Sequence, residues 1–150
     1  PLVDRHVERR HRLAARYEAC LAAEPGIALQ SIRPQDRSTR KDFSLVIDET
    51  RFGATSRLLQ SALDQENIQT RRYFDPPLHR QQLYRRFYRP EQDRLSTTAA
   101  ISRGVLSLPI HPHMSEQDAE RIAHRLLEIR NWIQSETASD TRRSENRPLT

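Results

Sequence analysis

The sequence contains one cysteine, three glycines and a single lysine among its 150 residues. A lone cysteine, Cys20, excludes an internal disulfide framework and is typical of a reducing compartment, so we expect a cytoplasmic protein. The scarcity of glycine argues against a glycine-rich loop that cradles phosphate groups. No apolar run approaches the roughly 18 residues of a transmembrane helix, and the first residues do not resemble a signal peptide. The sequence therefore predicts no membrane association.

Apolar and aromatic residues are also few. Hydrophobic residues make up 35% of the chain and aromatic residues 6%, whereas globular domains usually contain about 45–50% apolar residues. A chain of this length forms one domain, with or without tails. We expect a modest core and a surface that is partly covered by a partner.

Positive charge is concentrated in one segment. Between Arg71 and Arg103 there are eight arginines and three acidic residues, while the rest of the chain holds 17 basic and 17 acidic residues. Such a concentration attracts an anion, and nucleic acid, a nucleotide diphosphate and an acidic protein surface are all candidates. A solvated arginine-rich surface is equally compatible with this composition.

Hydrophobic periodicity predicts helices and strands in alternation. The expected helices cover residues 4–23, 55–66, 81–88, 96–104 and 115–136, and the expected strands cover 27–32, 43–47 and 105–108, with an extended run at 69–74. Residues 137–150 are polar and aperiodic, which predicts a disordered tail. Strands mixed with helices on a small sheet indicate an α+β or α/β domain with two layers.

Local signals mark several of these boundaries. Pro25-Gly26 stops the first helix, because glycine adopts the left-handed conformation after a helix and proline cannot continue one. Thr55 or Ser56 can cap the second helix, and Ser115 to Asp118 has the form of a capping box.

His79 is the first candidate site residue. It follows Asp75-Pro76-Pro77-Leu78, a rigid turn inside the basic segment, and Tyr73 lies shortly before that turn. A histidine held in this way suits a ligand-facing role, and the same pattern is compatible with an ordinary loop histidine.

Other candidates are weaker. His111 and His113 are spaced like a metal pair, but no cysteine or carboxylate stands at ligand spacing around them, so we expect no metal site. No nucleophile motif is present, and Lys41 lies between two charged residues instead of in the desolvated pocket that a Schiff-base lysine requires. We therefore expect no catalytic residue in this chain.

Aromatic and basic residues interleave in the segment from Tyr84 to Arg89. This pattern is found in proteins that bind single-stranded nucleic acid. At helical spacing, Leu83 with Phe87 and Tyr84 with Tyr88 are more often packing positions.

The sequence from Tyr73 to Tyr84, Tyr-Phe-Asp-Pro-Pro-Leu-His-Arg-Gln-Gln-Leu-Tyr, resembles the C-terminal small domain of the DegT/DnrJ/EryC1/StrS sugar aminotransferases. Three further segments resemble that domain in the same order: Phe43 to Asp48, Arg57 to Tyr73, and Leu106 to Ser115. The resemblance covers about residues 1–136. The family consists of pyridoxal-phosphate enzymes of fold type I.

The resemblance implies a domain organisation. Residues 1–24 would be an inter-domain linker helix, residues 25–136 the small domain with a short, mostly antiparallel sheet, and residues 137–150 a tail. The family's large domain, which carries the catalytic lysine and holds pyridoxal phosphate, is not among these residues. The chain alone is thus expected to be inactive and to bind no cofactor, whereas the complete enzyme would be a homodimer with that large domain as partner.

The resemblance also implies a reaction and its contacts. The complete enzyme would move an amino group, from glutamate, to a keto sugar linked to a nucleotide. Tyr73 and His79 would hydrogen-bond sugar hydroxyls, and Arg71 or Arg72 would pair with the diphosphate. By the alternation of a strand, Arg72 would point away from Tyr73.

A second hypothesis is a non-catalytic module. The chain would then be a remnant that binds a partner large domain through an apolar face, or a basic nucleic-acid binder, of which the nucleic-acid role is the less expected.

Overall fold

The computed structural model describes residues 2–89 and 94–145, and the sheet in these ranges has three short antiparallel strands. In sheet order they are β1 (Ile27–Leu29), β2 (Phe43–Ile47) and β3 (Val105–Leu108). Strand alternation in β2 buries Phe43, Leu45 and Ile47 on one face, and the residues between them are half-buried. Leu45 lies opposite Leu106, so β3 adds its leucines to the same face.

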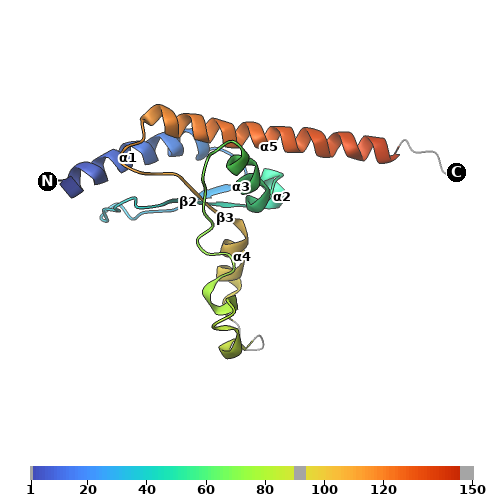
Figure 1. Ribbon diagram of the computed structural model, residues 1–150, viewed down its shortest axis with the longest axis horizontal. Coiled ribbons are helices and arrows are strands. Elements are labelled where there is room, and N and C mark those ends of the chain that lie inside the picture. Colours follow the sequence, from blue (N-terminus) through green and yellow to red (C-terminus); the bar gives the residue numbers. More distant parts are fainter. Residues whose placement is uncertain (1, 90–93, 146–150) are drawn as a thin grey trace.

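Two helices cover the buried face of the sheet. They are α1 (Leu2–Leu21) and α5 (Glu116–Glu145), and they lie side by side (Figure 1). Tyr17 of α1 is buried between these layers: its ring stacks on Phe43 with 4.8 Å between centroids. Its hydroxyl donates to the carbonyl oxygen of Pro109 at 2.8 Å. This two-layer α+β arrangement confirms the predicted fold class.

The first helix shares its core with the rest of the domain. Leu13, Tyr17 and Leu21 are buried in one cluster with Leu126 of α5. Residue 24 therefore does not separate two hydrophobic cores. The role of residues 1–24 as a linker to another domain stays a prediction.

Two helices follow β2: α2 (Glu49–Phe52), which the sequence did not predict, and α3 (Ser56–Gln65). Thr55 caps α3 as predicted, and its hydroxyl accepts a hydrogen bond from the Leu58 N–H at 3.0 Å. Gly26 has a φ of +82°, and a Cβ there would lie 2.5 Å from the amide nitrogen of Phe52. The loop after α1 thus requires glycine, as the sequence predicts.

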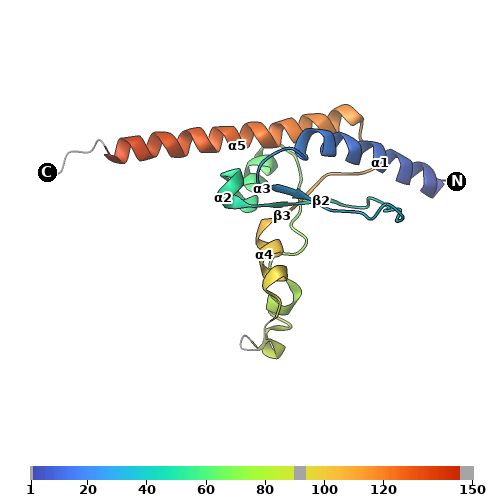
Figure 2. The ribbon, with the colours of Figure 1, turned by 180° about the vertical axis from the view of Figure 1, so that it is seen from behind.

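Residues 73–89 form an extension that we call the arm. It follows an isolated antiparallel bridge between Arg71 and Ser107, and it contains two 3₁₀ turns, η1 (Leu78–Arg80) and η2 (Arg85–Phe87). Helix α4 (Ser96–Gly104) then leads the chain into β3. Figures 1 and 2 show the arm and α4 projecting from the sheet on the side opposite to α1 and α5. No arm residue belongs to the core cluster of the described chain.

The helix predicted at residues 81–88 is wrong, because the structure has only a single 3₁₀ turn, η2, in that stretch. A short helix needs an apolar face that packs against something, and no arm residue belongs to the core cluster of the described residues. Leu83 and Phe87 are 68% and 66% exposed. Their interpretation as packing positions is wrong for the same reason.

Two predicted extended segments are shorter than expected. The strand at 27–32 ends at Leu29, after which Asp36 closes a turn onto the carbonyl of Arg33. The run at 69–74 pairs with the sheet only through Arg71.

Helix α5 is longer than expected. It continues to Glu145, so the predicted end near Glu136 and the predicted disorder of residues 137–145 are wrong. No glycine or proline interrupts this stretch, and the hydroxyls of Thr137 and Ser139 donate back to the carbonyls of Ile133 and Ser135, each at 2.9 Å. Residues 146–150 lie outside the described residues. None of the helices in the described ranges is long and apolar enough to cross a membrane.

Candidate functional site

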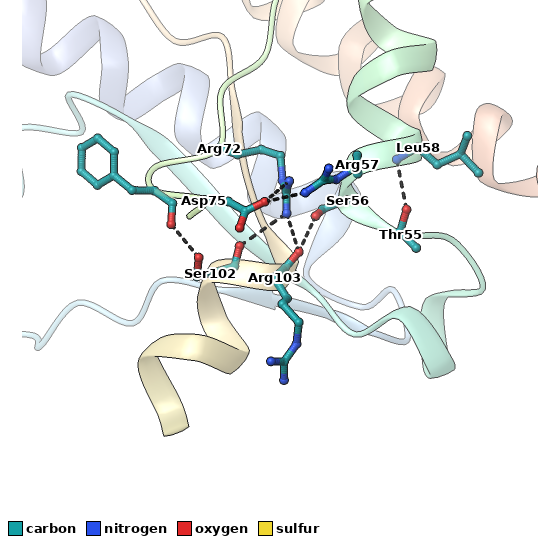
Figure 3. Close-up of polar contacts among 9 residues, drawn as sticks. Thr55, Ser56, Arg57, Leu58, Arg72, Asp75, Ser102 and Arg103 are labelled. Atoms are coloured by element: carbon teal, nitrogen blue, oxygen red, sulfur yellow. Dashed lines mark hydrogen bonds and ion pairs between the residues drawn. The ribbon is translucent and has the colours of Figure 1, made fainter. Parts of the chain in front are cut away.

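Arg72 lies where the arm leaves the sheet and where α4 returns to it (Figure 3). Its guanidinium donates to the carbonyl oxygens of Arg103 at 2.7 Å and Ser102 at 3.4 Å, and it forms an ion pair with Asp75. Carbonyls at the C-terminal end of a helix lack partners within the helix and favour a cation. The Arg72 side chain is only 10% exposed; its two Nη atoms make these internal contacts, and its Nε is buried without a hydrogen-bond partner among the described residues.

Two hydroxyls and a second arginine extend these contacts. Ser102 donates to the carbonyl oxygen of Phe74 at 2.6 Å, and Ser56 of α3 donates to that of Arg103 at 2.7 Å. Arg57 donates to the carboxylate of Asp75 at 3.0 Å from an exposed position. We call this set the arm-base network: Ser56, Arg57, Arg72, Asp75, Ser102 and Arg103, with the carbonyl of Phe74.

The arm carries His79 beside a groove of about 510 Å³. The imidazole lies 5.2 Å from the ring of Tyr88, measured between centroids. Its Nε2 is buried and has no hydrogen-bond partner in the described part of the chain. A buried polar atom of this kind is normally satisfied, so it indicates a position that a ligand or partner group can fill. The groove is lined by Leu78, His79, Tyr84, Phe87, Tyr88, Arg89, Arg94 and Leu95.

The structure places the other predicted residues differently. Tyr73 is 45% exposed, with its ring 5.4 Å from that of Phe74, and it does not line the groove beside His79. Arg71 is exposed; its main chain pairs with Ser107, and its guanidinium donates to the carbonyl of Thr70 at 3.2 Å. Tyr73 and Arg71 are thus exposed, whereas the Nε2 of His79 is buried beside the groove and Arg72 faces inward.

Sequence reasoning missed the partners of Arg72. It assigned Asp75 only to a turn before proline and gave Ser102 no role. Arg72 and Asp75 stand three residues apart with opposite charges, and this spacing is a signal from which the ion pair could have been predicted. The contact with Ser102 spans thirty residues of chain and has no local signature.

The remaining candidates of the sequence lie elsewhere. Lys41 is exposed in the loop between β1 and β2. Within residues 2–89 and 94–145, no three histidine, cysteine or acidic side chains are grouped to hold a metal ion. A larger depression of about 1170 Å³ runs along α5 beside His111 and His113, and it contains none of Arg71, Arg72, Tyr73 and His79.

Comparison with known proteins decides the family. The sequence profile of the DegT/DnrJ/EryC1/StrS aminotransferase family matches residues 2–127. The chain belongs to this family. It is 33% identical over 126 residues to the dTDP-3-amino-3,4,6-trideoxy-alpha-D-glucose transaminase of Streptomyces venezuelae, covering 84% of the chain and 31% of that enzyme.

Solved structures of aminotransferases show the same fold. The structure of DesI in the presence of its TDP-sugar product has a TM-score of 0.78 and 27% identity, covering 91% of this chain and 34% of that one. A putative sugar aminotransferase from Streptococcus pneumoniae, in a PLP form, has a TM-score of 0.71 and 17% identity, covering 85% and 32%. This aminotransferase-family chain therefore spans about a third of the length of the relatives it matches.

Pyridoxal phosphate belongs to the full-length enzymes of the family. The residues of this chain do not fit that cofactor. Its one lysine, Lys41, is exposed, and the neighbouring Arg40 is paired with Glu18 at 2.7 Å. A lysine that forms a Schiff base needs a desolvated pocket instead.

Proposed function

We propose that this chain is the small domain of a nucleotide-sugar aminotransferase and that its arm contacts the nucleotide-linked sugar. In the complete enzyme an amino group would pass from glutamate to a keto sugar. The catalytic lysine and the cofactor would be supplied by a large domain outside these 150 residues. The observation that carries the proposal is the arm of this family member, on which His79 has a buried Nε2 without a partner among the described residues, beside a groove lined by Arg89 and Arg94.

The chemistry of the arm suits such a substrate. A neutral imidazole offers one donor and one acceptor, and the Tyr73 hydroxyl offers both, as sugar hydroxyls require. A diphosphate needs cations, and exposed guanidinium groups bind it with paired, charge-assisted hydrogen bonds. Because Arg72 is enclosed in the arm-base network, we assign the diphosphate contact to Arg71, with Arg89 and Arg94 beside the groove.

The large domain would also cover the arm. Phe74, Leu78, Leu83 and Phe87 are all exposed, and clustered exposed apolar side chains mark interaction surfaces. We infer that the large domain of the complete enzyme, itself a homodimer, buries these residues. The surrounding arginines would favour an acidic surface on that domain.

Single-turnover kinetics test the sugar contact in a complete enzyme rebuilt by supplying a large domain. His79→Ala should slow the half-reaction with the sugar several-fold and leave the half-reaction with glutamate nearly unchanged. A lost hydrogen bond to the sugar costs about 0.5–1.5 kcal/mol, and the small amino donor does not extend to the arm.

The matched control is Gln82→Ala, an exposed arm residue outside the groove, which should change neither half-reaction. Equal losses in both half-reactions for His79→Ala would assign His79 to folding and remove it from the substrate site.

A further inference from the structure

We propose that Arg72 is a positioning residue, which fixes the direction of the arm and through it the placement of Tyr73 and His79. The benefit of this placement to substrate binding rests on the proposed function. The role of Arg72 in fixing the arm does not rest on it, because that role can be measured in the isolated chain. Arg72 would then contribute no contact to the diphosphate.

The first argument is where Arg72 lies along the chain. It directly follows Arg71, the last residue paired with β3 before the arm, and α4 ends at Gly104, where β3 begins. Arg72 binds Asp75 on the outgoing segment and the carbonyls of Ser102 and Arg103 on the returning one. One guanidinium therefore joins the start of the arm to the C-terminal end of α4.

The second argument is that little else holds the arm. None of its residues belongs to the core cluster of the described chain, and its large apolar side chains are exposed. Further bonds at the base, drawn in Figure 3, run from the Ser102 hydroxyl to the carbonyl of Phe74 at 2.6 Å and from the exposed Arg57 to Asp75 at 3.0 Å. The direction of the arm thus depends on polar contacts at its base.

The third argument is the chemistry of the group. A planar guanidinium presents donors in a rigid fork and can serve two carbonyls and a carboxylate together, which the ammonium of lysine cannot do in the same geometry. Asp75 has a second partner, Arg57, but that side chain is 78% exposed and reaches the carboxylate only from outside. Arg72 and Arg57 therefore share a partner while only Arg72 joins the two ends of the arm.

Double electron–electron resonance measures the direction of the arm in the full chain. Nitroxide labels at Gln82→Cys on the arm and Gln117→Cys on α5, two exposed positions, are placed in a Cys20→Ser background. The parent should give one narrow distance distribution. Arg72→Ala should widen it about twofold or more, because the base becomes a hinge. The distance distribution of Arg72→Lys should have a width between those of the parent and Arg72→Ala. Millimolar guanidinium should narrow the distribution of Arg72→Ala again.

The matched control is Arg57→Ala, which removes the other partner of Asp75 and should leave the distribution unchanged. The proposal is overturned if Arg72→Ala keeps its near-ultraviolet circular dichroism and also keeps the narrow distribution, or if Arg57→Ala widens it equally. If Arg72→Ala fails to fold, Arg72→Lys decides: a distribution wider than that of the parent supports the proposal, and an unchanged one rejects it. No substrate or cofactor enters this measurement, so its result is independent of the proposed reaction.

Discussion

Tyr17 shows how one side chain ties the first helix to the domain. Its ring is buried on Phe43, and its hydroxyl donates to the carbonyl of Pro109 at 2.8 Å, just past the end of β3. Burial, with a smaller contribution from the charge of Asp118, raises the pKa of this hydroxyl above its ordinary value of 10.0. The hydroxyl therefore stays neutral and keeps donating over the physiological range.

Replacing Tyr17 by Phe should lower the free energy of unfolding by about 1–3 kcal/mol, because it leaves the Pro109 carbonyl without its donor. The raised pKa also predicts a pH dependence. Stability that depends on the neutral hydroxyl is present below pH 10.0, the value in the unfolded chain, and is lost as the pH rises above it. Urea unfolding at several pH values measures both effects.

Tyr17→Phe should accordingly lose less stability than the parent between neutral and strongly alkaline pH. Tyr84→Phe, on the exposed arm, is the control and should follow the parent. An identical alkaline loss in Tyr17→Phe and parent would contradict the buried, neutral hydroxyl.

At the scale of elements, the last part of α5 extends beyond the body of the domain (Figure 1). Ile133 is the last buried apolar residue described on this helix, and Gln134 donates to the carbonyl of Phe52 at 3.0 Å. Side chains 135–139 are exposed. The helix after Glu136 therefore adds length without adding to the core.

A chain that ends at Glu136 should unfold with a free energy within about 0.5 kcal/mol of the parent, as surface changes usually do. Ile133→Ala, three residues earlier, should cost about 2 kcal/mol or more because it empties a buried position. Denaturant unfolding compares the two variants. A large loss on truncation would show that residues 137–150 pack on something.

Elements with local signals were predictable from the sequence, and those that depend on distant contacts were not. Thr55 and Ser115 cap their helices because a cap needs only residues three positions away. The helical spacing of Leu83 and Phe87 was misleading because it says nothing about whether a packing surface is near. The end of α5 was misplaced because polar composition alone does not stop a helix that meets no glycine or proline.

At the scale of the whole molecule, the one lysine of these 150 residues, Lys41, lies exposed instead of in the desolvated pocket that a Schiff-base lysine needs. Adding pyridoxal phosphate and then borohydride should give no specific adduct at Lys41, because that side chain is exposed to water. Peptide mass spectrometry of the folded chain measures the labelling. The same treatment of the urea-unfolded chain is the control and should label Lys41 to a similar extent. A far higher yield in the folded chain would contradict this reading.

The site was only partly predictable at this scale. The motif from Tyr73 to Tyr84 predicted substrate contacts and the eight arginines predicted an anion, and both stay predictions. Neither could reveal that Arg72 faces inward, since its partners Ser102 and Arg103 lie some thirty residues away. The charge of a segment is visible in its sequence, but the assignment of each arginine depends on the fold.

The separation of the arm from the core has a consequence for how enzymes of this family diverge. Because Leu78, Leu83 and Phe87 are exposed, substitutions of these three residues should change the free energy of unfolding of this chain little. Under the proposed function, selection for a new sugar would therefore act on this stretch without a compensating change in the sheet. Under the proposed function, a segment of equal length from a relative, transplanted between the same anchors, would change substrate preference without changing heat tolerance.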